Sequence, residues 1–351
     1  MNAKTALPVT PQATECSKRL GRIEHSQFQT ALDRLDLGKL CSVTPITAGN
    51  FGQNVFLTTD RGEYVFRGCP HYPWQFPKER YFARGLAQRT SVPVPWPYRL
   101  DLDSSIFGWP YVMMPRMPGI QLSDDLGSLS ESDRVAISCQ LGWTLKGLQQ
   151  FSHDACGEYD SYVDEIRPFS VDHFRWVSQR LTGLVRTAGE TLSDADRQWI
   201  DSLLARAREA LLLDFVPVFV MQDFKAGNTV ALKTGGQWTI SGVFDFMEPY
   251  FSDGEIDVSR HTYCCLGSKD PRSAVAFISA FVQAGGFRSG AGFRMPVYAL
   301  LDRLIIWNFG WRHGRPWWDP DLSFRDWMDL PRLQEVFQQG GVPDAYSTGD
   351  L

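Results

Sequence analysis

Residues 220–228 read VMQDFKAGN, and residues 243–246 read VFDF. Together they provide Asp223, then Asn228 five residues later, then Asp245 behind an apolar β-type segment. An Asp-x-x-x-x-Asn pair is a weak motif by itself, but it is far more specific between two β-type segments of which the second ends in Asp. The alternative for each side chain is a common one, the capping of a helix or the formation of a turn.

This set of side chains is the one that phosphoryl transfer from a nucleotide needs. Asp223 would accept a hydrogen bond from the attacking hydroxyl, as a base or an orienting group. Asn228 would bind Mg²⁺, and Gly227 makes it easier for a tight loop to bring both side chains to one side. Burial of the ionised Asp245 carboxylate at the end of a strand costs free energy unless a cation lies beside it. Magnesium held by nucleotide phosphates is the natural partner. We therefore predict a catalytic Asp223, with Asn228 and Asp245 as metal ligands.

Two further charged residues belong to the same region. Lys225 could reach the transferring phosphate from the loop and offset its developing charge, so we count it with the catalytic residues. Its alternative is a lysine of a solvated loop. Asp257 begins a later helical stretch, and its position favours a structural role in which its carboxylate accepts hydrogen bonds from the backbone of the catalytic loop.

Candidates for contact with an acceptor molecule are less sharply defined. Glu248 follows Asp245 closely and could face amines of an acceptor, or it could be a solvated turn residue. Asp253 is a second substrate-side candidate. Near the C-terminus lies a dense aromatic cluster, most of which we expect in the core, with one or two members lining a substrate cleft. The cluster comprises Trp307, Trp311, Trp317 and Trp318.

A glycine-containing segment, TAGNFGQN at residues 47–54, lies between two expected strands. Its glycines let backbone N–H groups approach phosphates without obstruction from side chains. It does not have the Gly-x-x-x-x-Gly-Lys-Ser/Thr pattern of P-loop enzymes, and a plain hairpin turn is an equally open interpretation. The nucleotide-binding candidates in it are Gly49, Asn50, Phe51, Gly52 and Asn54.

A buried ion pair is predicted beside this segment. Glu79 shares a helical stripe with Phe82, Ala83 and Leu86, so its carboxylate points inward among apolar side chains. Arg67, at the end of the preceding strand, is a good partner, and losing one half of such a pair costs about 3–5 kcal/mol. In a kinase-like site the cation would also touch the α and β phosphates; the alternative is a purely structural pair.

Composition limits the classes of protein to consider. The chain has 351 residues, 43% of them hydrophobic and 21% charged, which is typical of a globular protein of roughly two domains. The net charge of −5 gives no sign of a nucleic-acid partner and is compatible with a cationic substrate. The seven cysteines form no Cys-x-x-Cys pair, which favours a reducing compartment and argues against zinc. No secretory signal or membrane span is visible, so the cytoplasm is the expected location.

The periodicity of apolar residues predicts two lobes. We expect a flexible arm over 1–22, an N-terminal lobe over 23–115 and a mainly helical lobe over 116–351 that carries the catalytic loop and metal site. The expected strands of the first lobe are 40–47, 54–59, 63–67, 92–99 and 111–114, and its helices are 25–37 and 77–88. The helices expected later start at Ser130 or lie near 170–187, 194–213, 271–285, 293–311 and 322–338. This layout is an α+β, bilobal, protein-kinase-like fold.

The ordered set from Gly49 to Asp257 resembles the aminoglycoside phosphotransferase and choline kinase family, most closely its hygromycin-type branch, over about residues 40–330. The matching segments are YVFR at 64–67, KERY at 78–81, MMPRMPG at 113–119, QDFKAGN at 222–228, DF at 245–246 and SD at 252–253. The resemblance implies ATP or GTP as donor, Mg²⁺, a bilobal fold and a hydroxyl acceptor. It also implies that residues 111–116 form the interlobe hinge that meets the purine, which makes Met114 and Arg116 nucleotide-binding candidates.

The sequence departs from the family pattern at a few positions. Met221 and Gln222 stand where a histidine is usual, at a place whose role is mainly architectural. Arg67 replaces the lysine of many relatives, and Lys225 resembles the loop of protein kinases. These departures bear on the acceptor more than on the chemistry.

The leading hypothesis is an ATP-dependent O-phosphotransferase that acts on a small hydroxylated molecule: an aminoglycoside, another antibiotic, or a sugar or amino-alcohol metabolite. We expect no nucleic-acid or membrane partner, and a monomer or homodimer. A protein kinase is the first alternative, favoured by Lys225, but residues 245–257 contain no Ala-Pro-Glu text and no long activation segment. A nucleotide-binding module without transfer is the second alternative; Gln222 favours it, and the complete trio of Asp223, Asn228 and Asp245 opposes it.

Overall fold

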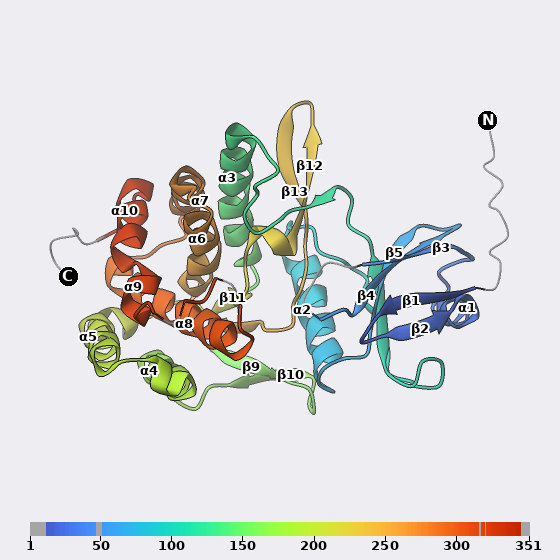
Figure 1. The fold of residues 1–351 in the computed structure, drawn as a ribbon, viewed down its shortest axis with the longest axis horizontal. Helices are drawn as coiled ribbons and strands as arrows, with labels where there is room; N and C mark the ends of the chain where they lie inside the picture. The colour runs from blue at the N-terminus through green and yellow to red at the C-terminus, as the bar shows by residue number, and fades with distance from the viewer. Residues whose placement is uncertain (1–11, 47–50, 316, 320, 345–351) are drawn as a thin grey trace.

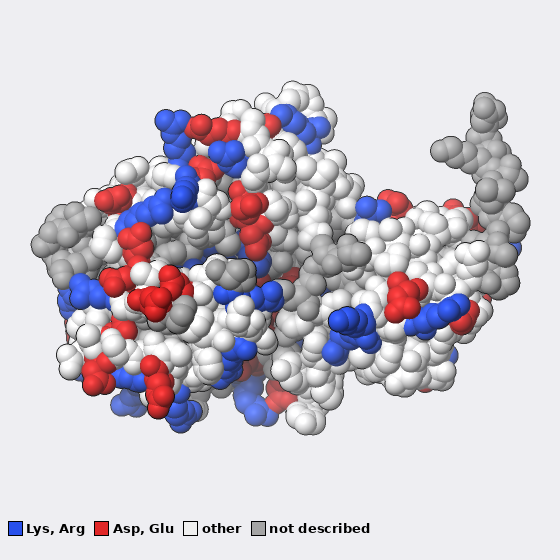
Figure 2. All heavy atoms as spheres, viewed as in Figure 1, with Lys and Arg blue, Asp and Glu red and all other residues white. Residues whose placement is uncertain are grey.

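The computed structural model describes residues 12–46, 51–315, 317–319 and 321–344. Figure 1 shows a β-rich lobe formed by the N-terminal part of the chain and a larger helical lobe formed by the rest. This confirms the predicted α+β fold class. The predicted Gly49 and Asn50 lie outside the described residues. Figure 2 shows acidic and basic side chains interspersed over one face of the molecule.

The N-terminal lobe is built on a five-stranded antiparallel sheet in the order β3-β4-β5-β7-β6. Successive residues of a strand point to opposite faces, and in β7 this separates two apolar cores. Tyr111 and Met113 pack into the outer core with helix α1 (His25–Arg34), whereas Val112 and Met114 belong to the main core. The strands are β3 (Leu40–Pro45), β4 (Asn54–Thr59), β5 (Glu63–Gly68), β6 (Arg99–Asp101) and β7 (Tyr111–Pro115).

One of the five predicted strands was wrong. Residues 92–98 form no strand, and the fourth strand covers only Arg99–Asp101. The reason is the run Pro93, Pro95 and Pro97, since proline has no N–H to donate to a ladder. The predicted helix at 77–88 is confirmed as α2 (Gln75–Arg89), and its buried stripe includes Glu79 as expected.

The prediction of an arm without regular structure over 1–22 was wrong for the residues from Ala13 onward. There β1 (Ala13–Ser17) and β2 (Gly21–Glu24) form an antiparallel hairpin that leads into α1 (His25–Arg34). Cys16, Leu20 and Ile23 are buried against the outer core. These isolated apolar residues lacked a clear period in the sequence, and tertiary packing supplies their partners.

The helices predicted for the second lobe are confirmed, with one difference. The stretch at 322–338 is two helices, because Asp329 adopts a left-handed φ of 47° and caps the second one by accepting from the N–H of Arg332. The helical stretch expected to begin at Asp257 is confirmed as a short helix that begins at Val258. The helices are α3 (Glu131–Leu148), α4 (His173–Ala188), α5 (Asp194–Leu211), α6 (Val258–Gly267), α7 (Pro271–Gln283), α8 (Ala291–Arg312), α9 (Phe324–Met328) and α10 (Leu330–Gly340).

Short strands bring the catalytic-loop sequence to the lobe boundary. In one sheet β12 pairs with β13, so that Thr229 lies opposite Val243, and the N–H of Phe244 donates to the carbonyl of Asn228 at 3.1 Å. Asn228 and Asp245 are therefore held on neighbouring strand ends. The strands are β8 (Ile120–Gln121), β12 (Thr229–Thr234) and β13 (Gln237–Val243) in this sheet, and β9 (Gly157–Asp160), β10 (Glu165–Pro168), β11 (Val218–Val220) and β14 (Tyr250–Ser252) in another.

Among the described residues, no helix has the length and apolar character that crossing a membrane requires.

The crossing of α3 and α7 yields a stability prediction. A Cβ at Gly142 would lie 2.4 Å from the carbonyl oxygen of Phe277 and 2.7 Å from Cβ of Ala280. Gly142→Ala should therefore lower the free energy of unfolding by about 1–3 kcal/mol, measured by urea denaturation. The control is Gly183→Ala in α4, where nothing lies within 4 Å and the gain in helix propensity should raise stability by about 0.5–1 kcal/mol. Equal effects of the two substitutions would contradict this packing.

Candidate active site

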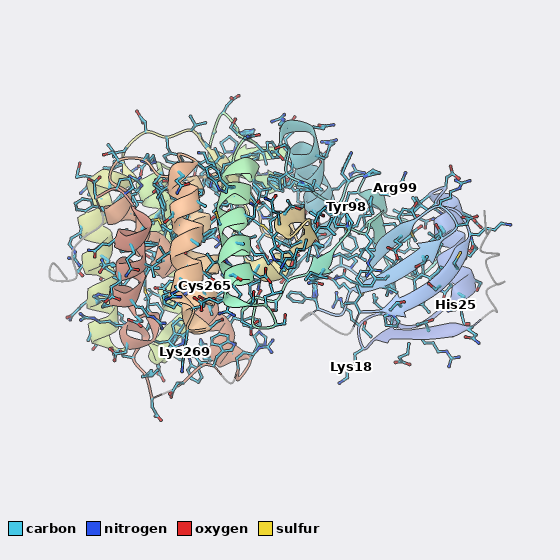
Figure 3. The ribbon with its side chains drawn as sticks, turned by 90° about the horizontal axis from the view of Figure 1, so that it is seen from above. Lys18, His25, Tyr98, Arg99, Cys265 and Lys269 are labelled. Carbon is cyan, nitrogen blue, oxygen red and sulfur yellow. The ribbon has the colours of Figure 1, made fainter. Side chains whose placement is uncertain are left out.

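A cavity of about 380 Å³ lies between the two lobes. Figure 3 shows Tyr98, one of its lining residues, where the sheet of the first lobe meets the second. Residues from both lobes and from the catalytic-loop sequence line it. The predicted site residues among them are Phe51, Gly52, Asn54, Arg67, Glu79, Met114, Arg116, Asp223, Lys225, Asn228 and Asp245.

The turn that leads into Asp223 is held by the buried carboxylate of Asp257. Its two oxygens accept hydrogen bonds from the N–H of Met221 at 2.6 Å and of Gln222 at 2.7 Å. Burial raises the pKa of Asp257 to about 7, although both backbone bonds favour the ionised form. Gln222 adopts a φ of 69°, so the chain turns sharply just before Asp223.

Gln222 itself has an architectural role. Its side-chain oxygen accepts from Nη2 of Arg180 and from the hydroxyl of Tyr250, both at 2.9 Å. Both donors come from elements that flank the loop, α4 and β14. A glutamine at this position therefore ties the catalytic loop to its surroundings.

Asp223 lies among cations and an amide donor. Its Oδ1 is 3.1 Å from Nη1 of Arg260, its Oδ2 is 3.5 Å from Nζ of Lys225, and Nδ2 of Asn228 donates to Oδ2 at 3.1 Å. Burial raises the pKa of Asp223, and the two cations act in the opposite direction. The side chain keeps about a third of its surface exposed toward the cavity, so a hydroxyl group could reach it.

Asp124 is a site residue that the sequence analysis missed. Its Oδ2 is 3.2 Å from Nζ of Lys225, and its Oδ1 accepts from the N–H of Gly227 at 3.1 Å. A Cβ at position 227 would lie 2.0 Å from that Oδ1, so this close approach requires glycine. Burial lowers the pKa of Lys225, but Asp223 and Asp124 outweigh it and raise the pKa overall. Asp124 belongs to no recognisable motif, because it lies in the loop after β8, far in sequence from residues 222–228.

Arg67 links the metal-site candidate to the N-terminal lobe. Its Nη2 lies 3.2 Å from Glu79 and 3.4 Å from Oδ1 of Asp245. Glu79 also accepts from Nε2 of Gln75 at 2.9 Å and from the hydroxyl of Tyr98. Burial raises the pKa of Glu79, which Arg67 opposes. The predicted pair is therefore present and lies at the wall of the cavity.

The residues that could hold a divalent cation are Asn228 and Asp245. The amide nitrogen of Asn228 donates to Asp223, which leaves its oxygen as a possible ligand. Asp245 has a φ of 73° and about a third of its side chain exposed, and it lines the cavity. Among the described residues no group of three or more His, Cys, Asp or Glu side chains could hold a metal ion. Phosphate oxygens and water would have to complete the shell, as is usual for Mg²⁺.

Two substrate-side candidates lie elsewhere. Asp253 is buried, and its carboxylate accepts from the hydroxyl of Tyr298 at 2.7 Å and pairs with Arg288. It is therefore a structural residue, and its assignment to the substrate is corrected. Glu248 is exposed and lines neither the interlobe cavity nor the larger cavity beside it, so its role stays a prediction.

A second cavity of about 640 Å³ opens beside the first. It shares Asp124 and Lys225 with the interlobe cavity, so the two cavities adjoin at the catalytic loop. Trp317 lines it, whereas Trp307 is buried in the core, and a substrate role for Trp317 stays a prediction. Arg260, which contacts Asp223, also lines it and was not predicted, because only the fold brings α6 to the loop.

The buried pair yields a second prediction. Arg67→Met should lower the free energy of unfolding by about 3–5 kcal/mol, because it leaves the Glu79 carboxylate buried without its cation. The double variant Arg67→Met with Glu79→Gln should recover most of that loss. Urea denaturation of the single variants and the double variant measures the coupling. Strictly additive losses would show that the two side chains do not interact.

Comparisons with known proteins identify the family and the fold. The model of the phosphotransferase enzyme family matches residues 42–291. No curated protein matches. The fold is similar to that of aminoglycoside 2'-phosphotransferase-IIIa in a GDP complex, with a TM-score of 0.59 and 15% identity over 90% of this chain and 96% of the other. It is also similar to aminoglycoside phosphotransferase APH(4)-Ia with ADP and hygromycin B, with a TM-score of 0.59 and 15% identity over 89% and 98%.

A third solved structure, the GDP and kanamycin complex of an APH(2") enzyme, is similar at a TM-score of 0.56 and 13% identity over 90% of this chain and 98% of the other. Identities this low establish the shared fold, and the assignment to a hygromycin-type branch stays a prediction. The family match spans most of both lobes and includes the catalytic-loop sequence. The chain belongs to the phosphotransferase enzyme family and has the kinase-like fold of the aminoglycoside phosphotransferases.

Proposed function

We propose that this phosphotransferase moves the γ-phosphate of ATP to a hydroxyl group of a small molecule, with Asp223 as the base or orienting group. One observation carries the proposal: Asp223, Asn228 and Asp245 line the same interlobe cavity, beside a second cavity large enough for an acceptor. The expected cytoplasmic location fits a nucleotide-dependent reaction and stays a prediction, as does a monomeric or homodimeric state.

Asp223 would act by position as much as by basicity. Arg260 and Asn228 hold its carboxylate from two sides, so its exposed surface is aimed into the cavity without rearrangement. An acceptor hydroxyl that donates to this carboxylate has its oxygen lone pairs directed at the phosphate. Orientation of this kind, with hydrogen bonding to the hydroxyl, lowers the barrier to transfer.

Charge on the transferred group would be met by cations that already stand in the site. Lys225 is held beside Asp223, and Arg67 lies beside Asp245. Fixed cations stabilise charge that develops in the transition state without reorganisation. A magnesium ion held by Asn228 and Asp245 would neutralise the phosphates when bound.

The nucleotide would occupy the interlobe cavity. Met114 lines it from β7, the predicted hinge, and Arg116 lies with its guanidinium carbon 4.0 Å from the ring centre of Phe56. Phe51, Gly52 and Asn54 line it from the N-terminal sheet side. We assign the purine to the hinge and the phosphates to the side of Arg67. Either ATP or GTP would fit this description.

The two alternatives gain no support. Gln222, which favoured a binding module without transfer, is accounted for by its contacts with Arg180 and Tyr250. Residues 245–257, where a protein kinase would need a peptide platform, contain the strand β14 and a short 3-10 turn at Gly254–Asp257.

The catalytic assignment is tested by Asp223→Asn. Removing the carboxylate charge should lower kcat by about 100-fold or more while the nucleotide Kd stays within about twofold. Asp201→Asn, the same change at an exposed position of α5, is the matched control and should have no effect. Transfer and ATP hydrolysis are measured with labelled ATP. Undiminished turnover in the Asp223 variant would refute the role.

The metal assignment is tested by Asp245→Asn. Mg²⁺ should tighten nucleotide binding to the native protein, and the substitution should reduce that gain about tenfold or more, because the amide has no charge to offer the ion. Calorimetric titration with a non-hydrolysable ATP analogue, with and without Mg²⁺, measures the difference. An unchanged response to Mg²⁺ would place the ion elsewhere.

A further inference from the structure

We infer that the acceptor is an anion: a hydroxyl compound with a carboxylate or phosphate group on a planar or apolar body, and not a polycationic aminoglycoside. The inference rests on the proposed function, because it concerns the acceptor side of the same site. It comes from the second cavity, which is lined by residues of α6, α8, α9 and α10 and by Arg315 and Trp317 between α8 and α9. Figure 1 shows where these helices lie in the helical lobe.

The cavity is placed to deliver an acceptor to the catalytic loop. Asp124 and Lys225 line both this cavity and the interlobe cavity, and Arg260 lines this one while contacting the carboxylate of Asp223 at 3.1 Å. A molecule that extends along this cavity as far as Lys225 and Arg260 would have a hydroxyl group close to Asp223. At about 640 Å³ the space fits a compound of one or two rings.

Basic side chains dominate the lining. Among the described residues five lining side chains are basic and two are acidic. A ligand with several ammonium groups would be repelled by these basic side chains, which lowers its affinity for the cavity. The basic residues are Lys225, Arg260, Arg303, Arg315 and Arg332, and the acidic ones are Asp124 and Asp329.

The acids in and behind the wall already have partners. Asp124 pairs with Lys225, and Asp329 accepts from the N–H of Arg332 at the start of α10. Asp302 is buried behind the lining, between Arg260 and Arg303, at 2.5 Å from each. A cationic ligand at Asp124 would therefore have to compete with Lys225, and among the lining acids of the described residues only Asp329 has no ion pair with a basic side chain.

Arg332 is the side chain best placed to meet an anion. It is half-buried at the first turn of α10, and within the described part of the chain no ion pair joins it to an acid. A guanidinium group presents parallel N–H donors that match a carboxylate or phosphate. The desolvated position strengthens such a contact relative to one at an open surface.

The aromatic side chains point to the same class of ligand. Trp317 is 43% exposed and lines the cavity together with Trp327, Tyr263 and Phe309. Arg303 already lies over the rings of Tyr263 at 4.2 Å and Trp327 at 5.4 Å. Those ring faces are therefore taken by a cation of the protein, and the remaining aromatic surface suits an apolar or planar ligand body.

Sugars that differ only in charge provide the test. Labelled phosphate transfer from ATP is measured with phenyl β-glucuronide, phenyl β-glucoside and phenyl β-glucosaminide, and with kanamycin and hygromycin B as polycations. Binding of each is measured by calorimetry with Mg²⁺ and a non-hydrolysable ATP analogue present. The anionic sugar should bind about tenfold more tightly than the neutral one, and the positive one more weakly still. Added salt should weaken binding of the anion.

The outcomes separate the inference from the function on which it rests. The inference is overturned if a cationic compound binds more tightly than the anionic sugar. It is also overturned if the anionic, neutral and cationic compounds all bind with the same affinity, or if none of them binds. Transfer to kanamycin that requires Asp223 would overturn it and leave the proposed function intact. If the Asp223→Asn variant retains full activity on any acceptor, the proposed function fails.

A variant locates the anion. Arg332→Gln should raise the Kd of the anionic sugar about tenfold. If the sugar is phosphorylated, its KM should rise by the same factor, whereas kcat and the KM for ATP should stay within about twofold. The matched control is Arg325→Gln on α9, an exposed arginine outside the lining, which should change nothing. Equal effects of the two variants would overturn the assignment to Arg332.

Discussion

The carboxylate of Asp257 is the contact on which the site depends. It accepts the N–H groups of two successive residues, Met221 and Gln222, at the point where the chain leaves a buried strand. Without it those N–H groups would be buried and unpaired, and the left-handed turn at Gln222 would have little to hold it. The bond therefore determines where Asp223 points, and the neighbouring strands then determine where Asn228 and Asp245 lie.

A second constraint is charge compensation around the two cavities. Arg260 lies between Asp223 and Asp302, and Arg67 lies between Glu79 and Asp245. Each arginine allows a buried acid and a partly exposed one to coexist that would otherwise repel one another. Because each also links two elements, the charges that a phosphate or an acceptor would meet are in place before any ligand binds.

The parts that could be predicted from the sequence are those determined by local pattern. The catalytic-loop motif, the inward Glu79 and most helices follow from spacing along a short stretch of chain. The false strand before Arg99 shows where the alternating pattern misleads, since alternating prolines imitate the period of a strand while removing its donors. The break at Asp329 and the hairpin from Ala13 depend on backbone conformation and packing that no period reveals.

Residues brought to the site by the fold were not predicted. Asp124 and Arg260 come from a loop and a helix far from the motif, and neither belongs to a motif. Their partners are charges on other elements, so only the tertiary arrangement gives them a role. The basic character of the second cavity has the same origin, because its arginines are dispersed between residues 260 and 332 in a chain whose net charge is negative.

The most direct test of the account is a crystal structure with Mg²⁺ and a non-hydrolysable ATP analogue. The account predicts that the ion contacts the side chains of Asn228 and Asp245, with the terminal phosphate facing Asp223 at the junction of the two cavities. A nucleotide bound outside the interlobe cavity, or an ion that touches neither side chain, would contradict it.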